Sequence, residues 1–202
     1  MSSSDTNPRL ILGSSSVYRK ELLSRLRLPF ETISPDIDET PLDGETPEIT
    51  AMRLAQAKAE AISARVSNAL IIGSDQVATL DGRQIGKPGT HDNALQQLLS
   101  MRGRIVIFHT ALCLLDNRSQ AQHRVQQANV QTRVHFRDLP EAELDAYLRA
   151  EQPYDCAGSA KNEGLGIAIL EKIETDDPTA LTGLPLITLT SMLRHANVTF
   201  FN

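Results

Sequence analysis

The 202-residue sequence has few cysteines, no long apolar run and no excess of positive charge, and each shortage excludes a class of protein. Cys113 and Cys156 are too few for a disulfide framework, and their apolar or small neighbours favour two core thiols in a reduced, cytoplasmic protein. No apolar stretch approaches the roughly 18 residues that span a bilayer. Residues 1–9 contain no hydrophobic segment, so we expect a disordered tail over residues 1–8 and no secretory signal.

The charge balance limits the partners that the surface can bind. A net charge of −5 argues against a general nucleic-acid-binding surface, which normally carries a basic excess. The content of 41% hydrophobic and 22% charged residues is that of an ordinary soluble globular protein. We therefore expect neither nucleic acid nor a membrane as a partner, whereas a small anionic ligand needs only a few local cations.

Three common catalytic motifs are absent. The spacing from Gly82 to Gly86 is one residue too short for a phosphate-binding P-loop, and Pro88 stands where that loop needs Ser or Thr. There is no G-x-S-x-G nucleophile elbow, and the five histidines show no zinc-binding spacing. The sequence thus disfavours a P-loop nucleotidase, a serine hydrolase and a zinc enzyme.

The remaining pattern predicts an α/β protein with a mixed, twisted sheet. Early strands and helices alternate, and longer antiparallel strands follow. We expect one domain over residues 9–202, with two lobes around a cleft. Predicted strands cover 9–13, 30–34, 70–80, 104–116, 121–136, 166–174 and 198–201, and predicted helices cover 17–27, 47–66, 91–101, 140–150 and 185–195. Whether the third strand continues to Leu80 or breaks at Asp75 is left open.

Asp75 and Gln76 end the apolar run that begins at Leu70, and Lys87 follows a predicted hairpin turn at Asp81-Gly82. Polar groups where a buried strand ends are typical of α/β active sites. Asp75 could pair with an acid of the 36–40 loop to hold a divalent ion, as Mg²⁺ prefers. A strand that simply ends at a polar turn, beside a solvated acidic loop, is the alternative.

Candidate groups for binding an anion lie on two predicted helices. Ser14 to Ser16 place hydroxyls and free N–H groups at a helix N-terminus, which favours phosphate, and Arg19 and Lys20 add charge. A serine cap with solvated basic residues is the alternative. Lys58 lies on the apolar face of its helix, so its ammonium either snorkels to solvent or points into the cleft.

Short motifs spread over residues 10–194 together resemble the Maf family of nucleoside triphosphate pyrophosphatases. They are S-x-S-x-x-R at 14–19, D-E-T at 38–40, R-L-A-x-x-K at 53–58, S-D-Q-V at 74–77, G-K-P at 86–88, C-A-G-S-x-K-x-E-G at 156–164 and G-L-P at 183–185. S-D-Q-V and K-x-E-G resemble the YceF-type branch, which is associated with 7-methyl-GTP. Two departures are the missing proline at Val17 and Lys20 in place of a second arginine, which keeps the charge but not the bidentate fork.

The resemblance implies hydrolysis of a nucleoside triphosphate to its monophosphate and pyrophosphate with Mg²⁺ or Mn²⁺, often by a homodimer. It implies an elongated mixed-sheet fold with a central cleft, and it implies that Asp75 is the proton acceptor. We further expect Glu39 and Asp75 to hold the metal. Lys58, Lys87, Arg19, Ser14 and Ser16 would neutralise the triphosphate, and Tyr18, Gln76 and Glu163 would select the base. A carboxylate bound to metal is a poor base, so Asp75 could instead orient a water on the ion.

Two other functions remain open. One is a non-enzymatic nucleotide-binding regulator of septum formation. The other is a hydrolase of a different phosphorylated compound, which includes a pyrophosphatase acting on dTTP, UTP or another modified nucleotide.

Overall fold

The computed structural model describes residues 8–119, 121 and 125–201. The tail expected over residues 1–8 lies outside this range apart from Pro8. The strands are β1 (Arg9–Gly13), β2 (Glu31–Thr32), β3 (Ala69–Leu80), β4 (Arg83–Ile85), β5 (Ile105–Asp116), β6 (Val125–Phe136) and β7 (Leu170–Thr175). The helices are α1 (Val17–Ser24), α2 (Pro47–Ser63), α3 (His91–Met101), α4 (Glu141–Glu151) and α5 (Leu186–His195), with short 3₁₀ turns at Ala157–Ser159 and Leu165–Ile169.

The strands form one mixed sheet in the order β2-β1-β3-β5-β6-β7, with β4 paired to part of β3. β2, β1 and β3 are parallel, and β3, β5, β6 and β7 pair antiparallel. This arrangement confirms the predicted mixed α/β class. β3 continues unbroken through Asp75, which pairs with Ala111 of β5, so the question left open for this strand is settled in favour of continuation.

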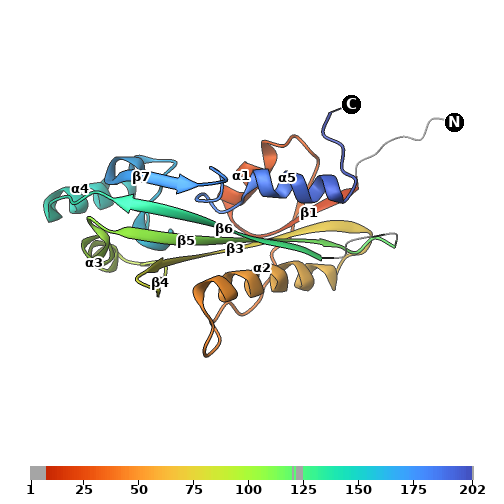
Figure 1. Ribbon diagram of the computed structural model, residues 1–202, viewed down its shortest axis with the longest axis horizontal. Helices are drawn as coiled ribbons and strands as arrows, with labels where there is room; N and C mark the ends of the chain where they lie inside the picture. Colours follow the sequence, from red (N-terminus) through yellow and green to blue (C-terminus); the bar gives the residue numbers. More distant parts are fainter. Residues whose placement is uncertain (1–7, 120, 122–124, 202) are drawn as a thin grey trace.

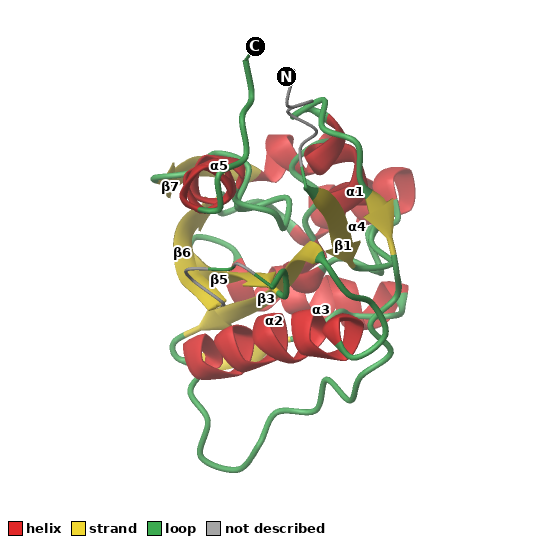
Figure 2. Cartoon of the chain, turned by 90° about the vertical axis from the view of Figure 1, so that its right-hand side faces the viewer, coloured by secondary structure: helices red, strands yellow, loops and turns green. Residues whose placement is uncertain are grey.

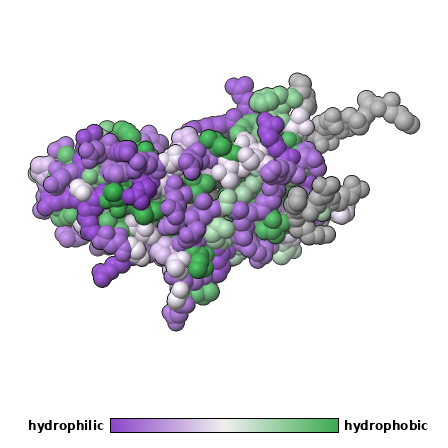
Figure 3. All heavy atoms as spheres, viewed as in Figure 1, coloured by the Kyte–Doolittle hydropathy of each residue, from purple (hydrophilic) through white to green (hydrophobic). Residues whose placement is uncertain are grey.

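The long strands β3, β5 and β6 run along the length of the molecule, as Figure 1 shows. Helix α2 lies against one face of the sheet, and α5 lies against the other (Figures 1 and 2). Helices α3 and α4 gather at one end, and one of the three buried apolar clusters lies among them and the nearby strands. The face in Figure 3 is mostly hydrophilic. Among the described residues, no helix is both long and apolar enough to cross a membrane.

Three expectations about the later part of the chain are wrong. Residues 198–201 form no strand, because Val198 packs into the core beside α5 and its N–H bonds to the Leu193 carbonyl. Residues 165–169 form a 3₁₀ turn, in which the Gly166 N–H bonds back to Lys161, and the strand begins only at Leu170. Cys156 is half-buried and is not a core residue, whereas Cys113 is fully buried and both thiols are free.

Several predicted boundaries shift by a few residues. α1 and α2 end three residues early, at Ser24 and Ser63, and only Glu31–Thr32 of the predicted second strand pairs with β1. β6 begins at Val125, and residues 122–124 of its predicted start lie outside the described range. Thr46 caps α2 as predicted, with its hydroxyl accepting from Ile49 N and Pro47 in the first turn.

The contact of α2 with β3 depends on a glycine. A Cβ at Gly73 would collide with the Ala55 carbonyl oxygen and would lie 2.9 Å from Ala59 N. Because Gly73 has no side chain and α2 presents small alanines, the helix backbone approaches the strand directly. This close approach brings Lys58, on the same face of α2, against the part of β3 that follows Gly73.

A carboxylate–guanidinium network ties the acidic loop to α2. Arg53 donates from Nε and Nη2 to the Glu45 carboxylate, and its Nη2 also donates to the Thr40 carbonyl at 3.1 Å. Glu45 also accepts from Leu42 N at 2.9 Å and Thr50 Oγ1 at 3.0 Å. These hydrogen bonds, the largest from Arg53, lower the pKa of Glu45 to about 2. The network thereby fixes the segment that carries Glu39.

We expect Gly73→Ala to destabilise the protein by about 1–3 kcal/mol or more, because α2 must move away from β3 to admit the methyl group. Urea unfolding followed by circular dichroism measures the change. The matched control is Gly86→Ala, where an added Cβ meets nothing within 4 Å. Equal stability of the two variants would contradict the role assigned to the close contact.

The lowered pKa of Glu45 predicts that the free energy of unfolding depends on pH in the acid range. Its folded-state pKa of about 2 lies below the ordinary 4.5, so its stabilising contribution is present above pH 4.5 and is lost as the pH falls towards 2. Glu45→Gln should be less stable at neutral pH and should show a shallower fall in unfolding free energy across this window. Urea titrations at several pH values test this, with the exposed Glu171→Gln as the control. An unchanged slope would show that the network does not contribute.

Candidate active site

The cleft forms where β1 stops and β3 continues. The last paired residues of these parallel strands are Gly13 and Gly73, after which β1 gives way to Ser14–Ser16 and α1. The side chains of β3 that follow Gly73 thus face a crevice at the carboxyl end of a parallel strand, the usual place for a ligand in such sheets. A cavity of about 450 Å³ opens here. It is lined by all ten predicted site residues: Ser14, Ser16, Tyr18, Arg19, Glu39, Lys58, Asp75, Gln76, Lys87 and Glu163.

An ion triad lies in the wall of this cavity. The Lys58 ammonium is 2.6 Å from Asp75 Oδ1 and 2.7 Å from Glu39 Oε1. The Lys58 and Asp75 side chains are only 5% and 9% exposed, whereas Glu39 is 57% exposed, so the first two form a buried pair and the third closes it from solvent. This geometry decides between the two readings of Lys58, whose ammonium points into the cleft.

Burial and charge act differently on the two carboxylates. Burial raises the pKa of Asp75 above its ordinary value, and the opposing charges of Lys58 and Arg19 do not fully compensate. Partial burial also acts to raise the pKa of Glu39, but there the hydrogen bond and charge of Lys58, helped by Lys87 and Arg19, prevail and lower it. The surroundings therefore make Asp75 more basic than an ordinary aspartate and Glu39 less basic than an ordinary glutamate.

At the start of α1, a serine hydroxyl caps the helix and Arg19 supplies a positive charge. Ser16 Oγ accepts from Arg19 N at 3.3 Å and caps the helix, and Ser14 Oγ accepts from Ser16 N at 3.1 Å. Arg19 turns into the cavity, where its Nε donates to the Gly183 carbonyl at 2.9 Å. Burial lowers the pKa of Arg19, with Asp75 and Glu39 opposing, yet a guanidinium stays charged at physiological pH. Lys20 is exposed and does not line the cavity.

Segment 180–183 forms one wall of the cavity, and the sequence motifs gave little indication of this wall. Gln76 Nε2 donates to the Ala180 and Leu181 carbonyls at 3.1 and 3.0 Å, and Ser74 Oγ donates to the Gly183 carbonyl at 2.9 Å. These contacts go to main-chain carbonyls, which carry no side-chain signature. The one available signal was Gly183 in the G-L-P motif, whose φ of 108° suits glycine. Gln76 thus holds this wall as well as facing the cavity.

The other end of the cavity surrounds Tyr18. The Lys161 ammonium lies 5.9 Å from the centroid of the Tyr18 ring and 3.1 Å from Glu151 Oε1. Partial burial at this end of the cavity raises the pKa of the nearby Glu163, although the Glu163 side chain still reaches solvent. Burial likewise raises the pKa of Cys156 to about 12, so this thiol stays neutral and is a poor nucleophile. This end therefore offers one aromatic ring and one carboxylate to a ligand.

Helix α4 holds the loop that forms this end. Glu151 accepts from Leu165 N at 2.7 Å, and Tyr147 Oη accepts from Lys161 N at 3.2 Å. A Cβ at Gly164 would lie 2.6 Å from the Glu151 carboxylate, so a side chain here would displace Glu151 from its present position against the loop. The loop bearing Glu163 is thus anchored on both sides of that residue.

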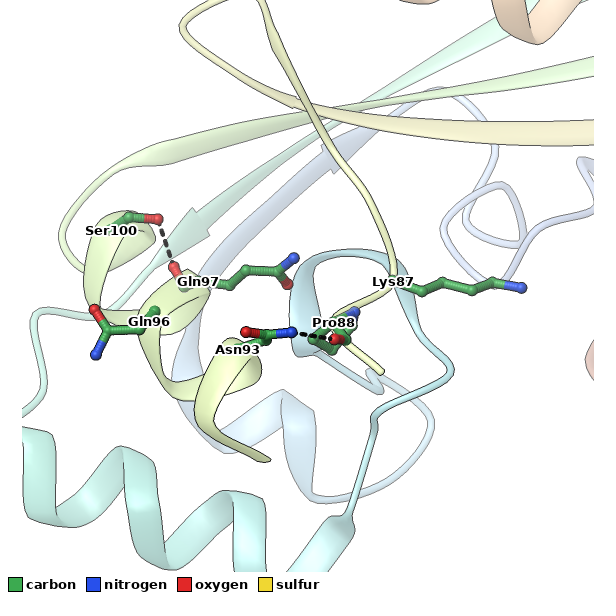
Figure 4. A pocket seen from close by; sticks show the side chains of 6 residues that line it. All are labelled: Lys87, Pro88, Asn93, Gln96, Gln97 and Ser100. Carbon is green, nitrogen blue, oxygen red and sulfur yellow. Dashed lines mark hydrogen bonds between the residues drawn. The ribbon is translucent and has the colours of Figure 1, made fainter. Parts of the chain in front are cut away.

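Lys87 lies between the main cavity and a shallower polar pocket of about 380 Å³ beside α3. In Figure 4 its side chain extends away from the amides of Asn93, Gln96 and Gln97, which line the smaller pocket. Lys87 also acts to lower the pKa of Glu39, which places its charge near the triad. We assign Lys87 to the main cavity.

The cavity is suited to a polyphosphate anion. Arg19, Lys58 and Lys87 supply positive charge from three separate elements around the basic carboxylate Asp75. No group of three or more His, Cys, Asp or Glu residues within the described ranges could hold a metal ion by itself. Glu39 and Asp75 do converge on one cation, as their contacts with Lys58 show, so a divalent ion bound there needs further ligands from water or substrate.

Comparisons with known proteins identify the family of the chain. The family model described as Maf-like protein matches residues 9–196. The chain is 67% identical over 199 residues to a protein of Cupriavidus metallidurans named 7-methyl-GTP pyrophosphatase, and the match covers 98% of each chain. A protein of Burkholderia orbicola with the same name is 64% identical, covering 96% of this chain and 92% of the relative.

A solved structure shares the fold at low sequence identity. The structure of a HAM1 protein from Coxiella burnetii matches with a TM-score of 0.51 at 17% identity, covering 92% of this chain and 98% of that one. Together, the family model and the relatives show that this chain, with the cleft described above, belongs to the Maf family.

Proposed function

We propose that this protein is a nucleoside triphosphate pyrophosphatase that hydrolyses 7-methyl-GTP to 7-methyl-GMP and pyrophosphate in the cytoplasm. The observation that carries the proposal is the buried, basic Asp75 carboxylate surrounded by the cations of Lys58, Arg19 and Lys87. A pure nucleotide-binding regulator would have no need to bury a carboxylate where the phosphates of the nucleotide bind. The names of the relatives support the substrate.

The reaction is the attack of water on the α-phosphorus with pyrophosphate as the leaving group. One oxygen of Asp75 can accept the proton of the attacking water while a cation holds the other, as the Lys58 ammonium holds Oδ1 before a nucleotide binds. The raised pKa of this carboxyl brings it closer to the operating pH, as a general base requires. Arg19, Lys58, Lys87 and the Ser14 and Ser16 hydroxyls stabilise the charge that develops on the phosphates.

Glu39 and Asp75 are the residues that would hold a divalent cation, Mg²⁺ or Mn²⁺. They fit such an ion because two carboxylate oxygens already converge on one point, and hard cations prefer oxygen ligands. When bound, the ion supplies positive charge that neutralises the triphosphate.

The base would lie between Tyr18 and Glu163. The guanine edge donates through N1–H and the 2-amino group, which suits the Glu163 carboxylate. Methylation at N7 makes the base cationic, and stacking on Tyr18 gains a cation–π interaction of roughly 0.5–2 kcal/mol. The Lys161 ammonium lies 5.9 Å from the centroid of this ring, so a cationic base would stack on the face of Tyr18 that Lys161 leaves open. Gln76 contributes by holding segment 180–183 against the ligand.

Product analysis tests the reaction. With Mg²⁺, the purified protein should release pyrophosphate and not orthophosphate from 7-methyl-GTP, and EDTA should stop the release. Asp75→Asn should lower kcat by about 10²–10⁴-fold while nucleotide binding is retained, because the general base is lost and the shape is kept. Asp92→Asn, an exposed change outside the cavity, should leave kcat unchanged. A nucleoside diphosphate as first product, or wild-type rates for Asp75→Asn, would refute the mechanism.

The base pocket has its own test. Glu163→Ala should lower kcat/KM for 7-methyl-GTP roughly ten- to a hundredfold, the loss expected for a hydrogen bond to a charged group of about 1.5–3 kcal/mol. Rates on UTP should change far less, and Tyr18→Ala should narrow the preference for 7-methyl-GTP over GTP. The exposed Glu171→Ala is the control. A wild-type preference for dTTP or UTP, or an equal loss on every triphosphate, would exclude this assignment and favour a pyrimidine or another modified nucleotide.

A further inference from the structure

The position between Glu39 and Asp75 already holds a cation, and that cation belongs to the chain. The Lys58 ammonium lies 2.7 Å from one carboxylate and 2.6 Å from the other. Its side chain is 5% exposed and reaches the cleft from the apolar face of α2. No other basic side chain within the described ranges makes an ion pair with either carboxylate, although the charges of Arg19 and Lys87 act on them from farther away.

The ammonium and a divalent ion cannot occupy this position together. Mg²⁺ binds carboxylate oxygens at about 2.0–2.1 Å, and an ion shared by Glu39 and Asp75 would lie almost at the place of the Lys58 nitrogen. Two like charges so close in a largely buried wall repel strongly. A divalent ion therefore bridges the two oxygens that Lys58 contacts, Asp75 Oδ1 and Glu39 Oε1, only after Lys58 has released them.

We propose that Lys58 is a resident cation that keeps the carboxylate pair closed until a nucleotide arrives. The inference rests on the proposed function, because the triphosphate is what draws the ammonium away. Lys58 exchanges the two carboxylates for phosphate oxygens, and the pair becomes free to bind the metal. Glu39 can give way readily, since it lies on a loop and is 57% exposed. Metal and nucleotide then bind cooperatively, and each raises the affinity for the other.

Metal binding without nucleotide provides the test. Mn²⁺ binding to the full chain is measured by the loss of the free-ion signal in electron paramagnetic resonance. Lys58→Met and Lys58→Gln should both bind Mn²⁺ about tenfold or more tightly than the wild type, because the competing charge is gone. If Lys58→Met fails to fold, Lys58→Gln alone decides the test, because the glutamine amide can still donate a hydrogen bond to Asp75. Circular dichroism checks the fold of each variant.

Two further variants separate this competition from a general charge effect. Lys87→Met removes one positive charge from the same cavity but contacts neither carboxylate, so it should change Mn²⁺ affinity far less. Adding Glu39→Gln to Lys58→Gln should abolish the gain, because one of the two ligands is lost.

The proposal is overturned if folded Lys58→Gln binds Mn²⁺ no more tightly than the wild type. It is also overturned if the gain survives Glu39→Gln or equals that of Lys87→Met. These assays contain no nucleotide. A failure to release pyrophosphate from 7-methyl-GTP would therefore refute the proposed function and leave the Mn²⁺ result to be judged separately.

Discussion

The contact between α2 and β3 is the constraint on which the cleft depends. Gly73 lets the Ala55 and Ala59 backbone approach the strand, and this approach carries Lys58 to Asp75. A buried carboxylate alone would be costly, as would a buried ammonium, and each makes the other tolerable. Removing either partner leaves an uncompensated charge in the wall. Close packing of α2 on β3 thus holds the Lys58–Asp75 pair in position in the wall of the cleft.

A second constraint is the unequal length of two parallel strands. β1 ends at Gly13, whereas β3 runs seven residues beyond its partner Gly73 to Leu80, where it pairs with β5 and β4. The sheet therefore remains rigid behind the cleft while its parallel neighbour turns away into α1. Successive side chains of β3 point to opposite faces of the sheet. Asp75 therefore faces α2, whereas Ser74 and Gln76 donate hydrogen bonds to segment 180–183 on the other face. One continuous strand in this way places the Asp75 carboxylate and one wall of the cavity.

Local sequence signals predicted most of the elements and much of the site. Thr46-Pro47 marked the start of α2, and the apolar neighbours of Lys58 placed it on the buried face, because both depend on residues close in the chain. The missing strand at 198–201 and the 3₁₀ turn at 165–169 show the limit, since an apolar run can pack beside a helix as well as in a sheet. The contacts of segment 180–183 run through main-chain carbonyls, and the triad joins three distant segments. Neither set of contacts is a local pattern, so only the separate motifs around Glu39, Lys58, Asp75 and Gly183 pointed to these segments.

The two ends of the cavity are built from separate parts of the chain, and this bears on how specificity arises. The phosphate end comes from α1, α2, β3 and the loops beside them, whereas the end around Tyr18 is closed by a loop that α4 anchors through Tyr147 and Glu151. Rigid elements hold the first, and the second is a loop of residues 155–163 carried on a scaffold. Substitutions in that loop can change the base that is bound without moving Asp75 or Lys58. Under the proposed function, the same phosphate end could thus serve different nucleotides, with base selection resting on Glu163 and its neighbours.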